Sequence, residues 1–345
     1  MGLWTDKKNK VSVDKPIAAH LQHSRLDQSE AAKTAVLGIT FYFFQSDLDL
    51  APSTSLAPVF VFLVSMSDFR ITTALRLTID SDTARALSDG SIDPLLDGLP
   101  LRLHLRRMLT AASAFGWLQA AEVLQSGGFE HSLAQLLLRA TAPVLQTSLD
   151  RDPHQRHSFK IRILVSKNGS LEIEHSGSEP LKPPIYPLTF LDNPFGHVTP
   201  AVCKVAIAQS PTDVSLFTQH KTTGRSMYEA AYSSLIGHPL APTAADVLLY
   251  NAHQLVTEAT LSTVYFPNAA GTAWLTPDLE CGGNAGTTRA WALEQGWCTE
   301  GKVLLSVAQQ MNGQTIWLSN AVRGFWPASI CLVPEEWEAH LRSYA

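Results

Sequence analysis

The chain has 345 residues, of which 45% are hydrophobic and 17% are charged. This composition is too apolar for a disordered protein, and the length allows two domains of roughly 100–200 residues each. The net charge of −5 at pH 7 argues against a basic nucleic-acid-binding protein and against a polybasic protein of membrane surfaces.

The first 65 residues show no clear periodicity. Residues 1–28 are polar and charged, which is typical of a flexible arm. The apolar runs Ala35–Phe44 and Ala57–Ser65 are shorter than the roughly 20 residues that span a bilayer. The lysines near the N-terminus are followed by polar residues rather than by an apolar segment. We therefore expect neither a signal peptide nor a membrane span.

A clearer pattern begins at Met66. The segment Phe69–Ile79 alternates and is rich in β-branched residues, which predicts a strand. The segment Leu101–Gln125 has apolar residues at helical spacing and runs into Ser126-Gly127-Gly128. This pattern predicts one long amphipathic helix that ends at the glycines.

A second helix is predicted over Leu133–Leu145. A β-hairpin follows, because Asn168-Gly169 lies between the strand-like segments Lys160–Val165 and Leu171–His175. Asn-Gly readily adopts the positive φ angles of a tight hairpin turn. The next segment, Glu179–Pro200, contains six prolines and is predicted to connect two domains.

The C-terminal half alternates between predicted strands and helices, which is the pattern of an α/β protein. The predicted strands are Val202–Ala208, Asp246–Tyr250, Thr260–Phe266, Val303–Val307 and Thr315–Leu318, and the predicted helices are Gly224–Ile236 and Thr287–Glu294. No internal repeat or low-complexity tract interrupts the sequence.

The cysteines and histidines do not form a metal-binding pattern. The four cysteines are scattered without a C-x-x-C pair, which fits a reducing compartment and a soluble cytoplasmic protein. His154 and His157 lie three residues apart in a polar stretch, where a solvated loop is the simpler interpretation. We therefore predict no metal site.

Four segments contain residues suited to chemistry. Lys221 lies in FTQHKTTGRSMY, between an extended stretch and a predicted helix. Glu258 interrupts an otherwise uncharged strand, where a carboxylate is costly unless a partner meets it. A glycine-rich loop leads into a predicted helix start at Thr287, and free N–H groups at such a start suit a phosphate. Arg107 lies near the start of the helix predicted over Leu101–Gln125.

Each of these features has an ordinary explanation when it is taken alone. They could be a surface lysine, a paired carboxylate, a simple turn and a charge on a helix surface. Together they provide an amine, a carboxylate, an anion cradle and an arginine. This set suits pyridoxal 5′-phosphate, whose aldehyde forms an imine with lysine, whose ring nitrogen pairs with a carboxylate and whose phosphate binds at a helix start.

The same segments resemble the fold-type IV pyridoxal-phosphate enzymes, also called the class IV aminotransferase family. The resemblance extends from about Met66 to the C-terminus. The family's motifs K-x-x-x-R, E-G-x-x-x-N-[VL]-[FY], T-P-x-L-x-x-G-x-x-x-G-[TI]-x-R and H-x-x-R-[LM] match Lys221 to Arg225, Glu258 to Tyr265, Thr276 to Arg289 and His104 to Met108, respectively. Two positions depart from the second motif: its glycine is Ala259 and its asparagine is Thr263.

Within the family, the fungal-type 4-amino-4-deoxychorismate lyases look most similar. The segments KIRILVSKNGSLEIE, FTQHKTTGR and WLSNAVRG resemble their counterparts in that branch. The strand FRITTALR keeps the phenylalanine and Arg76 of the lyase pattern but lacks its glutamate.

The resemblance implies an α/β fold of two domains with pyridoxal 5′-phosphate between them. Residues 66–184 would form the small domain, and residues 185–345 would form the larger cofactor-binding domain with a strand-rich, barrel-like core. Residues 1–65 would be an N-terminal extension outside the catalytic fold, or an artefact of the gene model. The family also implies a homodimer.

The resemblance also assigns roles to individual residues. Lys221 would be the Schiff-base lysine and the general base and acid, and Glu258 would hold the ring nitrogen. The phosphate would be anchored by Arg107, Thr287, Thr288, Asn320 and Ala321. Arg76 and Arg323 are candidates for binding the carboxylates of a substrate.

Two reactions remain open at this stage. A lyase would cleave aminodeoxychorismate into pyruvate and 4-aminobenzoate, a step of folate biosynthesis. An aminotransferase would act on branched-chain or D-amino acids or on (R)-amines. Either substrate is a small amino-bearing molecule, and both reactions use the same lysine and glutamate. The remaining alternatives are a pyridoxal-phosphate enzyme repurposed for secondary metabolism and a binding protein that has lost catalysis.

Overall fold

The structure is a computed structural model of the chain. It describes residues 9–13, 69–79, 92, 96, 99–149, 157–179, 186, 195, 203–268, 270–271 and 273–344. The two apolar runs before Met66 lie outside these residues, as does the predicted boundary after residue 184. The predicted connection Glu179–Pro200 is described only at Glu179, Tyr186 and Phe195.

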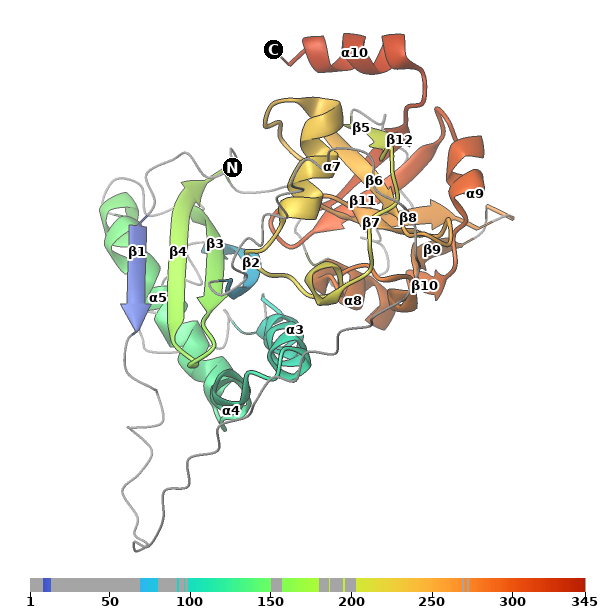
Figure 1. The fold of residues 1–345 in the computed structure, drawn as a ribbon. Helices are drawn as coiled ribbons and strands as arrows, with labels where there is room; N and C mark the ends of the chain where they lie inside the picture. The colour runs from blue at the N-terminus through green and yellow to red at the C-terminus, as the bar shows by residue number, and fades with distance from the viewer. Residues whose placement is uncertain are drawn as a thin grey trace, which may run out of the picture. The chain divides into compact units, whose positions relative to one another are not determined.

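A four-stranded antiparallel sheet is formed by the first half of the chain (Figure 1). Its order is β1-β4-β3-β2. The strands are β1 (Asn9–Val13), β2 (Ile71–Ile79), β3 (His157–Val165) and β4 (Leu171–Ser178). The predicted hairpin is confirmed as β3 and β4, and Gly169 has the expected positive φ of 80°.

The N-terminal segment contributes to this sheet. Residues 9–13 lie within the stretch that was expected to stand outside the catalytic fold, yet they form β1 along the outer edge of β4. Val11 and Val13 alternate with polar residues, which suits a strand at the edge of a sheet.

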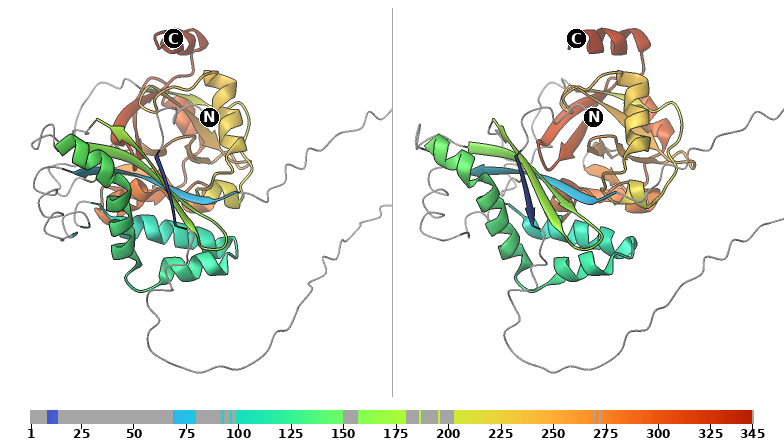
Figure 2. Two further views of the ribbon diagram at one scale, coloured as in Figure 1. Left: turned by 90° about the vertical axis from the view of Figure 1, so that its left-hand side faces the viewer. Right: turned by 60° about the vertical axis from the view of Figure 1, so that its left-hand side comes forward.

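One face of the small sheet is apolar and is covered by helices α3 (Leu101–Ala114), α4 (Leu118–Gln125) and α5 (Phe129–Leu149) (Figure 2). Leu75 lies opposite Ile161 and Leu77 lies opposite Phe159 on this face, and all four side chains are buried. Because strand side chains alternate between faces, the intervening residues lie on the other face. That face is polar.

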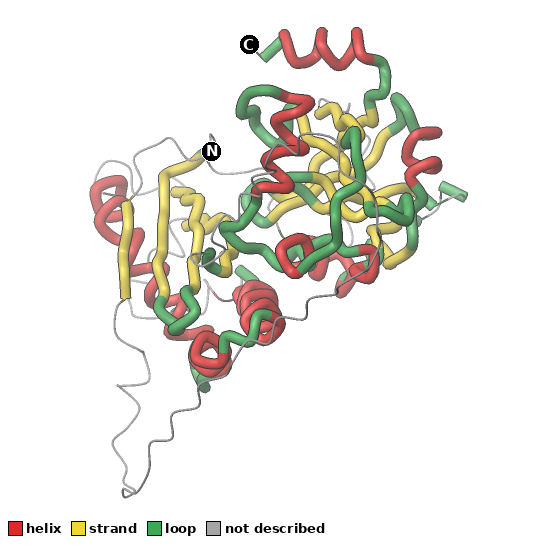
Figure 3. The backbone as a smooth tube through the Cα atoms, viewed as in Figure 1, coloured by secondary structure: helices red, strands yellow, loops and turns green. Residues whose placement is uncertain are grey.

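The second sheet has eight strands in the order β10-β9-β8-β11-β12-β5-β6-β7, and Figure 3 shows that it curves. Its strands are β5 (Cys203–Ile207), β6 (Ala245–Tyr250), β7 (Val256–Ala259), β8 (Thr263–Pro267), β9 (Trp274–Pro277), β10 (Cys298–Gly301), β11 (Thr315–Asn320) and β12 (Gly324–Ile330). The helical elements of this half are α6 (Leu216–Gln219), α7 (Ser226–Ile236), η5 (Leu279–Cys281), α8 (Thr287–Glu294), α9 (Leu305–Gln310) and α10 (Pro334–Arg342).

Two apolar clusters hold the second sheet. One includes Val264, Phe266, Ile316 and Leu318. The other packs the opposite side of the central strands against α7 and α10 and includes Leu249 and Trp337. Strands that are buried on both sides have continuous runs of apolar residues in their sequence. The last three residues of β6, Leu248 to Tyr250, form such a run.

The helix predicted over Leu101–Gln125 is wrong as one element. Gly116 has φ 66°, a left-handed conformation that ends α3 and that glycine adopts readily. The chain then turns through Trp117 and starts α4. The single amphipathic pattern therefore contains two helices.

Two predicted strands also differ from the structure. The segment Thr260–Phe266 becomes a strand only at Thr263, because the buried carboxylate of Asp246 accepts hydrogen bonds from the Thr260 hydroxyl at 2.6 Å and the Leu261 N–H at 3.2 Å and so holds a turn. The segment Val303–Val307 makes a single bridge at Leu304 and then continues as α9. None of the described helices combines the length and apolar character needed to cross a bilayer.

Candidate active site

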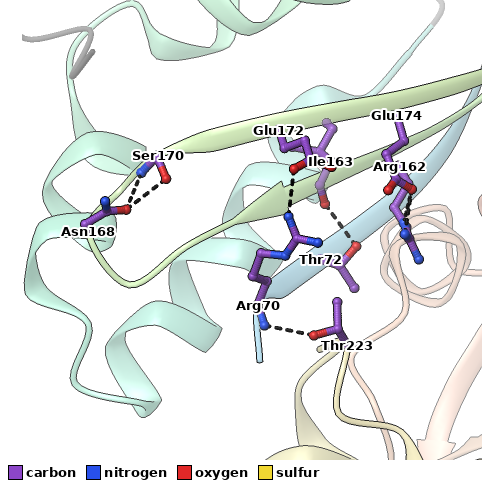
Figure 4. Close-up of polar contacts among 9 residues, drawn as sticks. All are labelled: Arg70, Thr72, Arg162, Ile163, Asn168, Ser170, Glu172, Glu174 and Thr223. Atoms are coloured by element: carbon purple, nitrogen blue, oxygen red, sulfur yellow. Dashed lines mark hydrogen bonds and ion pairs between the residues drawn. The ribbon is translucent and has the colours of Figure 1, made fainter. Parts of the chain in front are cut away.

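The backbone around Lys221 is fixed to the small sheet. Lys221 lies between α6 and α7, and its carbonyl accepts a hydrogen bond from Thr72 N–H at 2.9 Å. Two residues later, the Thr223 hydroxyl accepts a hydrogen bond from Arg70 N–H at 2.9 Å (Figure 4). These bonds join the lysine segment to the start of β2, so the lysine lies where the two sheets meet.

Lys221 is a half-buried residue. Burial lowers its pKa well below 10.5, and the positive charges of Arg225 and Arg107 lower it further, while Glu258 opposes them. A lysine of this kind is more often neutral than a surface lysine. A neutral amine can act as a nucleophile and can accept a proton.

Glu258, on β7, is held by two hydrogen-bond donors. Its Oε1 accepts from Tyr228 OH at 2.5 Å and from Asn284 N–H at 3.1 Å. Burial raises the pKa of the Glu258 carboxyl to about 7, although both hydrogen bonds and the charge of Arg225 oppose that shift. Glu258 and Lys221 each shift the pKa of the other, so the two side chains share one electrostatic environment.

Arg107, on α3, is joined to the glycine-rich loop. Its Nη2 donates to Asn284 Oδ1 at 2.7 Å. Its Nε is buried and has no hydrogen-bond acceptor among the described residues. Burial lowers the pKa of Arg107 to about 10, which leaves the guanidinium charged at neutral pH. A buried guanidinium with an unused N–H is suited to an anion.

His104 lies one helical turn before Arg107 and has a structural role. It is fully buried, and its ring nitrogens contact Thr73 Oγ1 at 2.8 Å and Tyr186 OH at 3.2 Å. Burial lowers the pKa of His104 to about 3, so the ring is neutral. Its contacts hold α3 against β2.

The start of α8 presents free backbone donors. Gly286 precedes the helix without a side-chain cap, and the first helical hydrogen bond runs from Ala290 N–H to Gly286 C=O at 3.0 Å. In the described part of the chain, the N–H groups of residues 287–289 have no backbone acceptor. The side chains of Thr287 and Thr288 are buried at this helix start. The helix dipole adds partial positive charge there.

The close approach of Gly283 to β7 gives a testable prediction. A Cβ at Gly283 would lie 2.5 Å from the Thr257 carbonyl oxygen, so the loop or the strand that carries Glu258 would have to move. We expect Gly283→Ala to destabilise the protein by roughly 1–3 kcal/mol, as measured by urea unfolding. Gly127→Ala is the control, because that Cβ meets no atom within 4 Å and its stability should be close to wild type.

Asn320 is the last residue of β11, and Ala321 begins the turn to β12. Asn320 Oδ1 accepts from Val322 N–H at 3.1 Å and from Arg323 N–H at 2.9 Å. The Ala321 carbonyl accepts from Arg76 N–H at 3.1 Å. The Asn320 side chain thus stabilises the turn itself, and this turn is a second link between the two sheets.

The two predicted substrate arginines differ in their contacts. The buried Arg76 side chain donates from Nε to Val322 C=O at 2.7 Å and from Nη1 to Ser178 Oγ at 2.7 Å. These bonds favour a role in joining the sheets. Arg323 has no side-chain hydrogen bond or ion pair to any described residue, and its charge lowers the pKa of Arg76. Arg323 is therefore the more available of the two for a ligand.

Comparison with known proteins identifies the family. Residues 83–331 match the family model described as amino-transferase class IV, which is well over half of the chain. The chain belongs to the class IV aminotransferase family. The resemblance seen in the sequence motifs and the mixed α/β fold class are confirmed.

Curated relatives match part of the chain. The aminodeoxychorismate lyase of Saccharomyces cerevisiae is 26% identical over 201 residues, which cover 50% of this chain and 51% of the yeast protein. A Schizosaccharomyces pombe protein that carries the same name provisionally is 34% identical over 125 residues, 34% of this chain and 49% of that protein. The chain spans about half the length of these relatives.

Solved structures are similar at lower identity. A fold IV-transaminase from Curtobacterium pusillum has a TM-score of 0.48 at 16% identity, with 80% of this chain and 85% of that chain covered. The 4-amino-4-deoxychorismate lyase from Pseudomonas aeruginosa has a TM-score of 0.45 at 16% identity, with 79% and 90% covered.

Within this member of the class IV family, the structure brings several predicted residues together. The charges of Glu258 and Arg107 shift the pKa of Lys221 in opposite directions, and the charge of Glu258 raises the pKa of Arg107. Arg107 also contacts the loop before α8 through its hydrogen bond to Asn284. Sequence analysis missed Asn284 and Tyr228 as partners of Glu258. Tyr228 lies in the first turn of α7, seven residues after Lys221, but only the tertiary structure shows that its hydroxyl meets the carboxylate.

Proposed function

We propose that this chain binds pyridoxal 5′-phosphate between Lys221, Glu258 and the start of α8. The observation that carries the proposal is the buried Arg107 Nε, which has no acceptor among the described residues. Arg107 is linked through Asn284 to the loop before α8, where the N–H groups of residues 287–289 have no backbone acceptor in the described part of the chain. An anion would satisfy both, as phosphates do at helix starts. A lysine with a lowered pKa and a half-buried carboxylate shift each other's pKa. The donor set therefore fits the cofactor.

The cofactor, when bound, supplies an aldehyde that condenses with amines and a ring that withdraws electrons from the neighbouring carbon. Lys221 would provide the amine that holds the aldehyde. Once released by an incoming substrate amine, the neutral Lys221 side chain would take a proton from the amine-bearing carbon and later return one. Its lowered pKa supports both tasks.

Glu258 would accept the N–H of the ring nitrogen. Its Oε1 is already used by Tyr228 and Asn284, while no described residue donates to its Oε2. The two donors fix the carboxylate plane, so Oε2 has a defined direction. An ionised Glu258 would keep the ring nitrogen protonated.

The phosphate would be anchored by charge and by backbone donors. Arg107 would direct Nε to it, and the first turn of α8 would supply the N–H groups and the hydroxyls of Thr287 and Thr288. Asn320 and Ala321, in the β11–β12 turn, complete the predicted anchor through their backbone. Charge-assisted bonds of this kind are stronger than neutral ones.

For the reaction, we favour a lyase that converts 4-amino-4-deoxychorismate into pyruvate and 4-aminobenzoate. The support is that the curated relatives of this chain carry the name aminodeoxychorismate lyase. The substrate has two carboxylates, and Arg323, with no side-chain partner among the described residues, is a candidate to bind one of them. Loss of the enolpyruvyl group leaves an aromatic ring, which drives the reaction forward.

The test is a product assay on the full chain with pyridoxal 5′-phosphate. With 4-amino-4-deoxychorismate, we expect pyruvate and 4-aminobenzoate in equal amounts. A second arm supplies branched-chain amino acids, D-alanine or (R)-amines with 2-oxoglutarate and measures carbonyl products. Product in the second arm without pyruvate in the first would replace the lyase with the aminotransferase. A purified protein without an absorbance band that borohydride removes would contradict cofactor binding itself.

A further inference from the structure

Two exposed arginines of α3 meet one carboxylate at the end of α8. Arg102 donates from Nη1 and Nη2 to the two carboxylate oxygens of Glu294 at 3.1 and 2.6 Å, and Arg106 donates to Glu294 Oε1 at 3.1 Å. These three side chains are the Glu294 clamp. Exposed ion pairs stabilise a protein measurably when an arginine binds both oxygens of a carboxylate or when several charges form a network. The Glu294 clamp does both.

The charges of the clamp oppose the dipoles of their own helices. Glu294 is the last residue of α8, where the helix dipole disfavours a carboxylate. Arg102 is the second residue of α3, whose first turn contains no acidic residue, and a cation is disfavoured there. Each charge is therefore stabilised by its partner on the other helix. In agreement, the hydrogen bonds from Arg102 and Arg106 lower the pKa of Glu294.

The clamp joins two helices that pack on different sheets. α3 contacts β2 of the small sheet, whereas α8 contacts β10 and β11 of the second sheet (Figure 1). Near the start of α8, Arg107 donates to Asn284, and Tyr186 lies between His104 of α3 and Thr287 of α8. The clamp holds the other end of α8. Without it, the described hydrogen bonds between the two helices would lie only near the start of α8.

We infer that Glu294 is a positioning residue: by holding α3 against the end of α8, it keeps the Arg107 guanidinium in place for an anion bound at the start of α8. The inference rests on the proposed function, in which that anion is the phosphate of pyridoxal 5′-phosphate. Arg107 follows Arg106 directly in α3, so a movement of α3 relative to α8 moves both side chains. A protein that has the aligned arrangement only part of the time binds its ligand more weakly in proportion to that fraction.

The experiment measures the affinities of the apo protein for pyridoxal 5′-phosphate and for pyridoxal, which lacks the phosphate. Glu294→Gln keeps the size of the side chain and removes its negative charge. By charge alone, this change would favour an anion, whereas the loss of positioning weakens its binding. We expect Glu294→Gln to weaken pyridoxal 5′-phosphate binding about three- to fivefold, the size of an exposed ion-pair network, and to leave pyridoxal binding unchanged.

Glu338→Gln is the matched control. It removes the same charge from an exposed ion pair with Arg342 within α10, so it should not weaken binding of either ligand. Unchanged or tighter pyridoxal 5′-phosphate binding by Glu294→Gln would overturn the inference. Equal weakening for both ligands, with a lower apo melting temperature, would indicate a purely structural role and would overturn it as well.

A double-mutant cycle provides the second measurement. Arg102→Gln removes the arginine that binds both oxygens of Glu294, so its effect on pyridoxal 5′-phosphate affinity should be smaller in Glu294→Gln than in the wild type. Equal effects in the two backgrounds would contradict the clamp. If the wild-type protein binds neither ligand, or binds both equally, the proposed phosphate site fails. If it prefers the phosphorylated ligand and Glu294→Gln keeps the wild-type affinities, only the positioning role of Glu294 fails.

Discussion

Replacing Lys221 with alanine is expected to lower turnover at least about 10³-fold in either reaction arm, because the variant loses both the amine that holds the aldehyde and the group that moves the proton. The visible absorbance band of the cofactor-loaded protein should disappear with it. Steady-state kinetics measure the turnover of the wild type and the variant, and absorbance spectra show whether the band is present. Retained turnover would show that the assignment of Lys221 is wrong.

Lys167→Ala is the matched control. Lys167 lies exposed in the β3–β4 hairpin, outside the hydrogen bonds that fix the Lys221 segment. This variant should keep both the absorbance band and the activity. A loss in both variants would indicate a general effect of removing lysine rather than the chemistry of one amine.

The lowered pKa of Lys221 also has a consequence for stability. Below pH 10.5, the amine of the unfolded chain is protonated, while the amine of the folded chain resists protonation. The unfolded state therefore binds more protons than the folded state in this range. As a result, the free energy of unfolding decreases as the pH falls from 10.5 to the lower pKa of the folded state. Relative to apo Lys221→Met, the apo wild type should become less stable in urea as the pH is lowered over that range.

Parts of the structure could be predicted because their signals are local. Asn168-Gly169 defines a hairpin by turn chemistry alone, and the glycine-rich loop before Thr287 marks a helix that starts at that residue in the structure. Glu258 was predicted as a site residue because it interrupts an otherwise uncharged strand, whereas Lys221 and Arg107 were predicted from their places beside helix starts and from the family motifs. Such features need no knowledge of distant contacts.

Other parts depend on tertiary contacts. The short strands β7, β9 and β10 have four residues each, too few to show a period. The turn at Thr260 depends on the Asp246 carboxylate, which comes from a neighbouring strand. Likewise, Arg76 looked like a free cation in its strand, but the fold surrounds it with acceptors from β4 and the β11–β12 turn. Only the assembled sheets determine these partners.

Glu258→Gln is the second variant with a large expected effect. The amide keeps the size of the side chain and an oxygen that can accept from Tyr228 and Asn284, but it cannot supply the negative charge that would stabilise a protonated ring nitrogen. We expect kcat to fall roughly 10²–10⁴-fold, the range of a positioned ionisable group. Cofactor affinity should change much less, since Arg107 and α8 are intact. Steady-state kinetics and equilibrium binding separate the two effects.

Tyr228→Phe tests the same carboxylate from its partner side. It removes one donor to Glu258 Oε1 and leaves the charge, so its activity should lie between those of the wild type and Glu258→Gln.

The pH dependence of the stability of the apo protein separates the effect of the Glu258 charge from the effect of packing. Burial raises the pKa of Glu258 from 4.5 to about 7, so the folded state retains a proton that the unfolded state loses, and stability falls as the pH rises through this window. Glu258→Gln should lack that fall, whereas Tyr228→Phe, which removes a bond that favours the ionised form, should extend it to higher pH. If the stability of the wild type, measured against Glu258→Gln, does not decline between pH 4.5 and about 7, burial does not raise the pKa of Glu258.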